Sequence, residues 1–250
     1  YEEFLSFHQR YYHPSNSYIY LYGNLDAEEY LTFLEENYLK DFDSLTIDSE
    51  IRQQEPFAEK REIVKEYSIM EDEPVRENTY LTYNVSMGSS LDRKLYAAMD
   101  ILDYVLCSAP GTPVKQALID AGIGKDVYST MENGIAQPYF SIVAKNADED
   151  QKEAFVSVIE DTLKKLVEEG IDRKALQAAV NYFTFKYREG DFGSYPKGLM
   201  LGLQAMDSWL YDKKEPFMHI EANQTYEELK EAITEDYYEE LIDRYLLKNP

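Results

Sequence analysis

The stretch "DVYSTMENGIAQPYFSIVAK", residues 126–145, decides the fold that this chain is expected to adopt. Its two ends, residues 126–131 and 138–145, are rich in the β-branched and aromatic residues that favour strands. Between them lies Asn133-Gly134, a dipeptide that favours the tight reversal of a hairpin. The stretch therefore predicts two antiparallel strands, around which the other elements should assemble.

Strand-like and helix-like patterns surround this hairpin. Alternating, β-rich patterns predict further strands at residues 17–23, 61–70 and 77–85. Apolar residues at helical spacing predict helices at 1–12, 27–42, 90–106, 149–169, from 172 onwards and at 197–211. Asp26 is predicted to be the N-cap of the helix at 27–42, and a short helix is predicted to end at Gly122–Gly124. A capping box from Thr225 to Glu228 predicts the start of the last helix. This order predicts an α+β fold, with helices packed on one face of an antiparallel sheet.

The chain is predicted to contain two units. Residues 46–61 are polar, contain Pro56 and lack a clear periodicity, so they are predicted to form a linker. They would separate residues 1–45 from a larger unit, residues 62–250. The chain begins without Met inside one helical pattern and stops directly after another, so we expect it to be an excised segment of a longer protein.

Composition limits the partners that the chain can have. It has 48 acidic and 25 basic residues among 250, for a net charge of −23. Phosphate binding requires clustered Lys and Arg, so nucleic acid and anionic membranes are not expected partners, whereas a cationic partner would be attracted. No apolar run approaches the roughly 20 residues of a membrane span. No targeting signal is visible, so a cytoplasmic location is expected by default.

The histidines and the cysteine do not form a recognisable chemical site. His8 and His13 are five residues apart across a helix end and Pro14, whereas a zinc-binding pair on one helix face is four residues apart. Both are therefore predicted to be structural, as is the isolated His219. Cys107, the single cysteine, lacks a local nucleophile signature and is predicted to be a buried thiol.

Four separated stretches carry a resemblance to a known family. They are "FHQRYYHPSNSYIYLYGNLD" (7–26), "SAPGTPVKQALIDAGIGKDV" (108–127), "QPYFSIVAKNAD" (137–148) and "REGDFGSYPKGLMLGLQAMDSWLYD" (188–212). In this order they resemble the presequence protease branch of the insulinase-type, or pitrilysin-type, zinc metallopeptidases. The resemblance extends over nearly the whole chain.

This resemblance implies a specific place for the chain in a larger enzyme. Such enzymes have four related α+β domains in two halves, which enclose a chamber for unfolded peptides. Their zinc site is an inverted HxxEH motif with a downstream Glu in the first domain, and this chain contains no HxxEH. By the same resemblance, residues 1–45 are the tail of the first domain and residues 62–250 are the second, non-catalytic, metallopeptidase-like repeat domain. No catalytic residue, metal ligand or cofactor is assigned to this chain, and zinc would belong to the parent protein.

The resemblance also implies a peptide-binding edge. In insulin-degrading relatives, a strand edge of the second domain anchors the substrate's N-terminus through backbone pairing, which tolerates varied sequences. The matching positions here are the turn at Gly111 and the strand Val127, Tyr128, Ser129 and Thr130. The histidine- and glycine-rich run that frames this site in those relatives is absent from this sequence.

Three functional hypotheses follow. The first is a non-catalytic segment of a zinc metalloendopeptidase that degrades unfolded peptides. This segment would form part of the chamber wall and anchor substrate, and its partners would be the parent's other domains and unfolded, basic peptides. The second is a scaffold or interaction subunit of the same fold, from a catalytically inactive homologue. An HxxEH motif in the parent would distinguish these two hypotheses. The third is a stand-alone acidic, tyrosine-rich module that binds peptides or glycans, which natural chain ends at residues 1 and 250 would favour.

Overall fold

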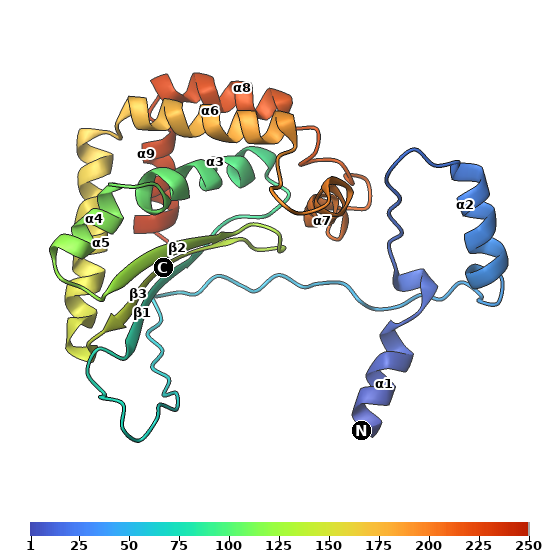
Figure 1. The fold of residues 1–250 in the computed structure, drawn as a ribbon, viewed down its shortest axis with the longest axis horizontal. Coiled ribbons are helices and arrows are strands. Elements are labelled where there is room, and N and C mark those ends of the chain that lie inside the picture. Colours follow the sequence, from blue (N-terminus) through green and yellow to red (C-terminus); the bar gives the residue numbers. More distant parts are fainter. Residues whose placement is uncertain (250) are drawn as a thin grey trace.

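A three-stranded antiparallel sheet lies at the centre of the structure, a computed structural model that describes residues 1–249 (Figure 1). The strands are β1 (Thr79–Ser86), β2 (Asp126–Glu132) and β3 (Tyr139–Ala147), and their order in the sheet is β1-β3-β2. The hairpin predicted from the sequence is confirmed, because β2 pairs antiparallel with β3 from Asp126 opposite Lys145 to Glu132 opposite Tyr139.

Helices cover one face of this sheet, as the sequence predicted (Figure 1). Those that contact the strands are α3 (Arg93–Asp103) with its continuation η3 (Tyr104–Ser108), α4 (Pro113–Asp120), α5 (Lys152–Glu169), and η6 (Ile242–Leu247), which continues α9 (Tyr237–Leu241). A second layer, α6 (Arg173–Glu189) and α8 (Asn223–Glu231), lies over α3, with the short η5 (Ala232–Thr234) after α8. The α+β architecture follows.

The core lies between the sheet and these helices. Alternate residues of a strand point to opposite faces, and in β3 the helix-facing set is Phe140, Ile142 and Ala144, all buried. Apolar side chains at helical spacing meet them from the other side, among them Leu102 of α3 and Ile159 of α5. The spacing that predicted the helices is therefore the same spacing that builds the core.

Two predicted strands are not strands in the structure. Residues 17–23 and 61–70 have no regular secondary structure and pair with no other strand among residues 1–249, whereas the predicted strand at 77–85 is confirmed as β1. A strand needs a neighbour to satisfy its backbone groups, and alternation in the sequence cannot supply one. The predicted capping box at Thr225 is also wrong: α8 begins at Asn223 without a side-chain cap, and Thr225 is buried inside the helix.

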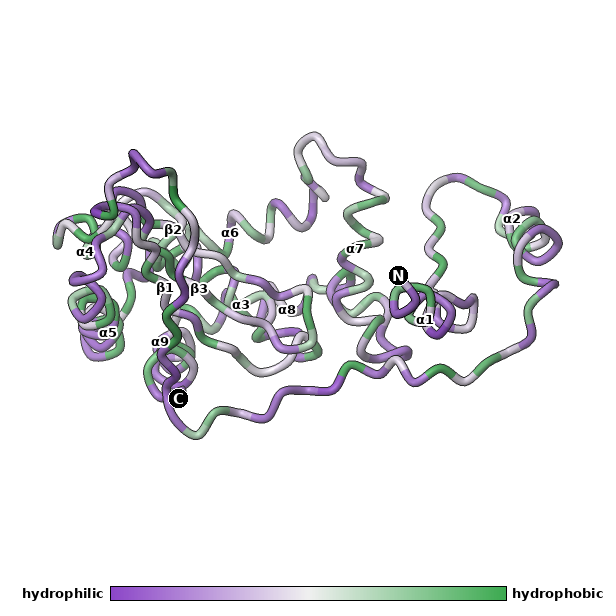
Figure 2. The backbone as a smooth tube through the Cα atoms, turned by 90° about the horizontal axis from the view of Figure 1, so that it is seen from below, coloured by the Kyte–Doolittle hydropathy of each residue, from purple (hydrophilic) through white to green (hydrophobic). Residues whose placement is uncertain are grey.

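An arm precedes the α+β body. It contains α1 (Glu2–Tyr11), the turn η1 (Pro14–Asn16), and α2 (Ala27–Leu34) with η2 (Glu35–Leu39), and Asp26 caps α2 as predicted. Neither α1 nor α2 has a buried residue. Figure 2 shows hydrophobic and hydrophilic residues mixed along this arm, whose helix α2 lies away from the body. A long segment without helix or strand then leads to β1. No helix among residues 1–249 is long and apolar enough to cross a membrane.

Helix α7 (Lys197–Trp209) joins the arm to the body. The ring of Tyr20 lies so close to Gly202 that a Cβ there would be 2.8 Å from the ring's Cδ1 atom. Tyr22 makes the same kind of approach to Gly198, one helical turn earlier. Tyr18 packs edge-on against Trp209, with ring centroids 4.7 Å apart. Tyr20 and Tyr22, two residues apart in the arm, thus pack against two glycines that are four residues apart on α7.

We predict that Gly202→Ala loosens this joint without weakening the body. The added methyl group must displace the ring of Tyr20. The helix itself should not be weakened, because alanine is more favourable than glycine in a helix interior by about 1 kcal/mol. Trp209 is the single tryptophan, so its fluorescence emission should shift to longer wavelength while the far-ultraviolet circular dichroism is unchanged. Leu203→Ala, on the same helix at an exposed position, is the control and should leave the emission unchanged. An unchanged emission in Gly202→Ala would contradict this account of the joint.

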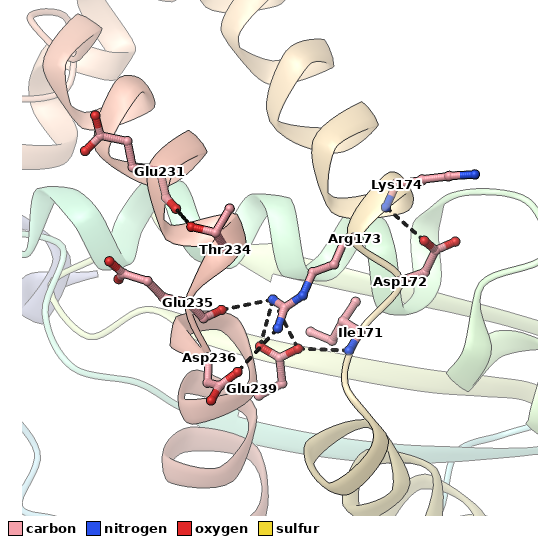
Figure 3. A network of polar contacts seen from close by, with 9 residues as sticks. All are labelled: Ile171, Asp172, Arg173, Lys174, Glu231, Thr234, Glu235, Asp236 and Glu239. Atoms are coloured by element: carbon pink, nitrogen blue, oxygen red, sulfur yellow. Dashed lines mark hydrogen bonds and ion pairs between the residues drawn. The ribbon is translucent and has the colours of Figure 1, made fainter.

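An ion-pair network ties the start of α6 to α9 (Figure 3). The Arg173 guanidinium donates to the Glu235 carbonyl at 2.9 Å and pairs with the carboxylate of Glu239 at 3.4 Å. Glu239 is buried and also accepts the Ile171 N–H at 2.9 Å, whereas the second partner of Arg173, Asp236, is exposed. A buried carboxylate needs such partners, because without them its charge is stabilised neither by a counter-charge nor by water.

Replacing the buried carboxylate should cost far more than replacing the exposed one. Glu239→Ala leaves the Ile171 N–H without its acceptor and is expected to lower the free energy of unfolding by roughly 2–4 kcal/mol. Asp236→Ala removes an exposed partner of Arg173 and should cost less than about 1 kcal/mol. Urea unfolding followed by circular dichroism measures both values. Equal losses in the two variants would contradict the assignment.

Candidate functional site

The outer edge of β2 is the part of the sheet best placed to bind a polypeptide. Strand β2 pairs only with β3 among residues 1–249, so its other edge has no strand beside it. Such an edge presents a row of N–H and C=O groups that can pair with an extended peptide. The four strand residues that the resemblance pointed to, Val127 to Thr130, all lie on β2.

The register of the sheet shows which backbone groups of β2 face this edge. The Met87 N–H donates to the Pro138 carbonyl, so even-numbered residues of β3 direct their backbone groups to β1 and odd-numbered ones to β2. Val143 is odd-numbered and lies opposite Tyr128, so the backbone of Tyr128 is bonded into the sheet. The neighbouring Ser129 therefore directs its N–H and C=O to the free edge.

The face of the sheet without helices is polar. Its side chains are the alternate set of each strand and are mostly hydroxyl and amide groups around one buried apolar residue, Val143 of β3. The others include Tyr80, Thr82, Asn84 and Ser86 of β1, Tyr139, Ser141 and Lys145 of β3, and Tyr128 and Thr130 of β2. The Ser141 hydroxyl donates to Asn84 at 2.7 Å across the β1–β3 pair. Tyr80, Tyr128 and Tyr139 remain substantially exposed. A surface of this kind is wet, and it offers hydrogen bonds and aromatic contact without a large apolar patch.

On the helix side of the β2 edge, two serines hold the carboxylate of Asp103. The Ser129 hydroxyl donates to one carboxylate oxygen of Asp103, and the Ser108 hydroxyl donates to the other at 2.7 Å. Ser108 is the last residue of η3, and Gly111 lies in the turn that follows it, with a positive φ of 72°. The structure thus brings the Gly111 turn and the predicted strand to one edge of the sheet.

A partly buried acidic cluster lies one turn earlier on the same helix. Asp100 of α3 is half-buried and accepts a hydrogen bond from the side-chain amide of Asn133, in the β2–β3 loop, at 3.0 Å. Burial disfavours its charged form and raises the pKa of Asp100 to about 7. Beside it, the Tyr96 hydroxyl donates to Asp207 of α7 at 2.8 Å. The Tyr96 ring stacks on His219, and burial lowers the pKa of His219 to about 4.

The histidines and the cysteine do not fit a zinc site. His8 stacks on Tyr12, and His13 accepts the Ser15 N–H through its Nδ1 atom. His219 is buried against Tyr96, as described above, and Cys107 is a buried free thiol, as predicted. Among residues 1–249 no group of three or more His, Cys, Asp or Glu side chains is arranged to hold a metal ion.

Sequence reasoning missed Asp103. It lies in a predicted helix among many acidic residues, and its two serine partners are five and 26 positions away. No local motif connects the three residues. Only the packing of η3 against β2 brings them together, so no signal in the sequence alone could have singled out this carboxylate.

Solved structures define the class of fold. A protease from Helicobacter pylori superposes with a TM-score of 0.64 at 13% identity, over 98% of this chain and 56% of that one. The inactive peptidase domain of a protein from Bordetella parapertussis gives a TM-score of 0.51 at 11% identity, over 68% of this chain and 87% of that one. The chain therefore shares its α+β fold with these two proteins.

Sequence comparison identifies the family. The profile described as "Peptidase M16 inactive domain" matches residues 1–183, and the chain belongs to this family. Over its full length the chain is 46% identical to Protein HypA of Clostridium perfringens, covering 26% of that protein. It is 34% identical to Presequence protease 1, chloroplastic/mitochondrial, of Arabidopsis thaliana, covering 24%. The chain thus spans about a quarter of the length of these relatives and is a non-catalytic M16 domain of a peptidase-like protein. The resemblance to presequence proteases is confirmed.

The raised pKa of Asp100 predicts a loss of stability as the pH rises. The folded state holds a proton on this carboxyl up to about pH 7, whereas an unfolded aspartate loses it near pH 3.8. The stabilising contribution of that proton therefore declines between about pH 4 and pH 7. Asp100→Asn removes this titration, so its free energy of unfolding relative to the wild type should increase from pH 5 to pH 8.

Urea unfolding of both proteins at the two pH values checks this prediction. The comparison with Asp100→Asn also cancels the opposite trend of His219, whose lowered pKa makes the fold more stable as the pH rises through about 4 to 6.5. A constant difference between wild type and variant across this range would show that Asp100 does not titrate there.

Proposed function

We propose that this chain forms part of the chamber wall of a larger zinc metalloendopeptidase that degrades unfolded peptides, and that the β2 edge holds the peptide away from the zinc. The observation that carries the proposal is the free backbone of Ser129 on an edge strand beside a helix-free, polar sheet face. Backbone pairing suits a degrader of varied peptides because it does not depend on side chains. Zinc would be held by other domains of the parent.

The arm supports a place within a larger assembly. Helices α1 and α2 carry large exposed apolar side chains, including Phe4, Phe7, Leu31 and Phe33, and have no buried residue. Amphipathic helices gain most of their stability by packing an apolar face, so other domains of the parent are the proposed partners. This arrangement disfavours a stand-alone binding module. A scaffold subunit from an inactive parent remains the alternative, and an HxxEH motif in the parent's preceding domain decides between the two.

The proposed anchor predicts a specific response to proline at Ser129. Ser129→Pro removes the N–H at the free edge, a position where an edge strand tolerates proline, and should weaken binding of an unfolded fluorescent peptide about tenfold. Ser129→Ala loses the same hydroxyl but keeps the N–H, and should change the dissociation constant less than about threefold. Fluorescence anisotropy measures all three proteins.

Proline at Tyr128 is not an equivalent test. The backbone of Tyr128 is bonded to β3, so proline there would disrupt the sheet itself. If the two Ser129 variants bind the peptide as tightly as the wild type does, the β2 edge is not the anchor. If the wild type does not bind the peptide at all, the anchoring proposal fails as a whole.

A further inference from the structure

We infer that Asp103 recognises a lysine or arginine side chain of the peptide held at the β2 edge, an inference that rests on the proposed function. The starting observation is a charge without a counter-charge. Both carboxylate oxygens of Asp103 accept hydroxyl hydrogen bonds, from Ser108 and Ser129. Yet no Lys, Arg or His nitrogen among residues 1–249 lies within 4.0 Å of them.

The two hydroxyl groups orient the carboxylate but do not neutralise it. Asp103 is half-buried. Water screens a half-buried carboxylate less than an exposed one, so a cation that reaches it gains more than it would at the open surface. Charge-assisted hydrogen bonds to a carboxylate are also stronger than neutral ones. A cationic group is therefore the ligand that this position lacks.

A peptide that pairs with the β2 edge as an added strand would place one of its side chains beside Asp103. Ser129 directs its backbone to the free edge, so an added strand pairs there with one residue opposite it. Residues opposite each other in an antiparallel pair have side chains on the same face, with Cβ atoms about 4.5–5.5 Å apart. Because the Ser129 side chain points to the helix face and contacts Asp103, the opposing peptide side chain enters beside that carboxylate.

The surroundings leave space for a long side chain. Ser108 is exposed, and a Cβ built on Gly111 would meet no atom within 4 Å. Lysine and arginine carry their charge on flexible stems that can lie along this turn. On the opposite face of the sheet, Tyr128 and Thr130 offer no such charge, so recognition is confined to alternate residues of the peptide. The ligand that the β2 edge and Asp103 together would select is an extended peptide with a basic residue at the position opposite Ser129.

The test compares matched peptides on matched proteins. The probe is an unfolded, fluorescently labelled peptide of serine and threonine with an acetylated N-terminus and a single central lysine, so that lysine is its only cation. The second peptide has glutamine and the third glutamate at that position. In the wild type the lysine peptide should bind about tenfold more tightly than the glutamine peptide. Asp103→Asn, which keeps the shape and an acceptor for the serines, should bring the ratio close to one.

A charge reversal and a remote control separate recognition from structure. Asp103→Lys should prefer the glutamate peptide, a gain that a merely structural residue would not produce. Asp161→Asn removes one negative charge from an exposed site on α5 and should leave the lysine preference intact, which excludes the net charge as its cause. Circular dichroism establishes that each variant is folded.

The outcomes distinguish this inference from the proposal on which it rests. If wild type binds the lysine and glutamine peptides equally, and Ser129→Pro weakens both, the peptide edge stands and the role of Asp103 is overturned. If the lysine preference survives in Asp103→Asn, another group recognises the cation and the inference is also overturned. If no peptide binds to the wild type, the proposed anchor itself fails.

Discussion

The rest of the structure depends on the pairing of β3. This strand is bonded on both sides, to β1 and to β2, and it carries the buried side chains on which the first helical layer packs. A sheet of three strands with one fully bonded strand necessarily has two outer edges. The function proposed here is a consequence of that constraint, because helices cover one face and no strand among residues 1–249 lies beside the outer edge of β2.

The carboxylates of this chain differ in burial and in their partners. The chain is strongly acidic overall, and most of its carboxylates are exposed to solvent. Glu239 and Asp103 differ from these and from each other. Glu239 is buried and paired with Arg173, whereas Asp103 is half-buried and accepts hydrogen bonds from hydroxyl groups that bring no opposite charge. Glu239 has its counter-charge within the fold and Asp100 holds a proton instead, whereas the counter-charge of Asp103 is proposed to come from a ligand.

Sequence reasoning predicted most of the body and little of its chemistry. Helices such as α3 and α5 were predictable because their apolar residues repeat at helical spacing, and the β2–β3 hairpin because a turn dipeptide joins two β-rich runs. Residues 17–23 and 61–70 were wrongly predicted as strands because pairing depends on a neighbour, not on the segment itself. Asp103 was not predictable because its partners meet it only through tertiary packing.

The order of the strands has a consequence for how the body assembles. The β2–β3 hairpin closes a short loop, but β1 must reach β3 across α3, α4 and β2, with Val85 pairing with Phe140. Loop-closure entropy makes such a distant pairing slower than a local one. The hairpin is thus expected to form while the other edge of β3 is not yet paired with β1. During synthesis and refolding, that temporarily open side of the central strand is where the chain is most vulnerable to aggregation.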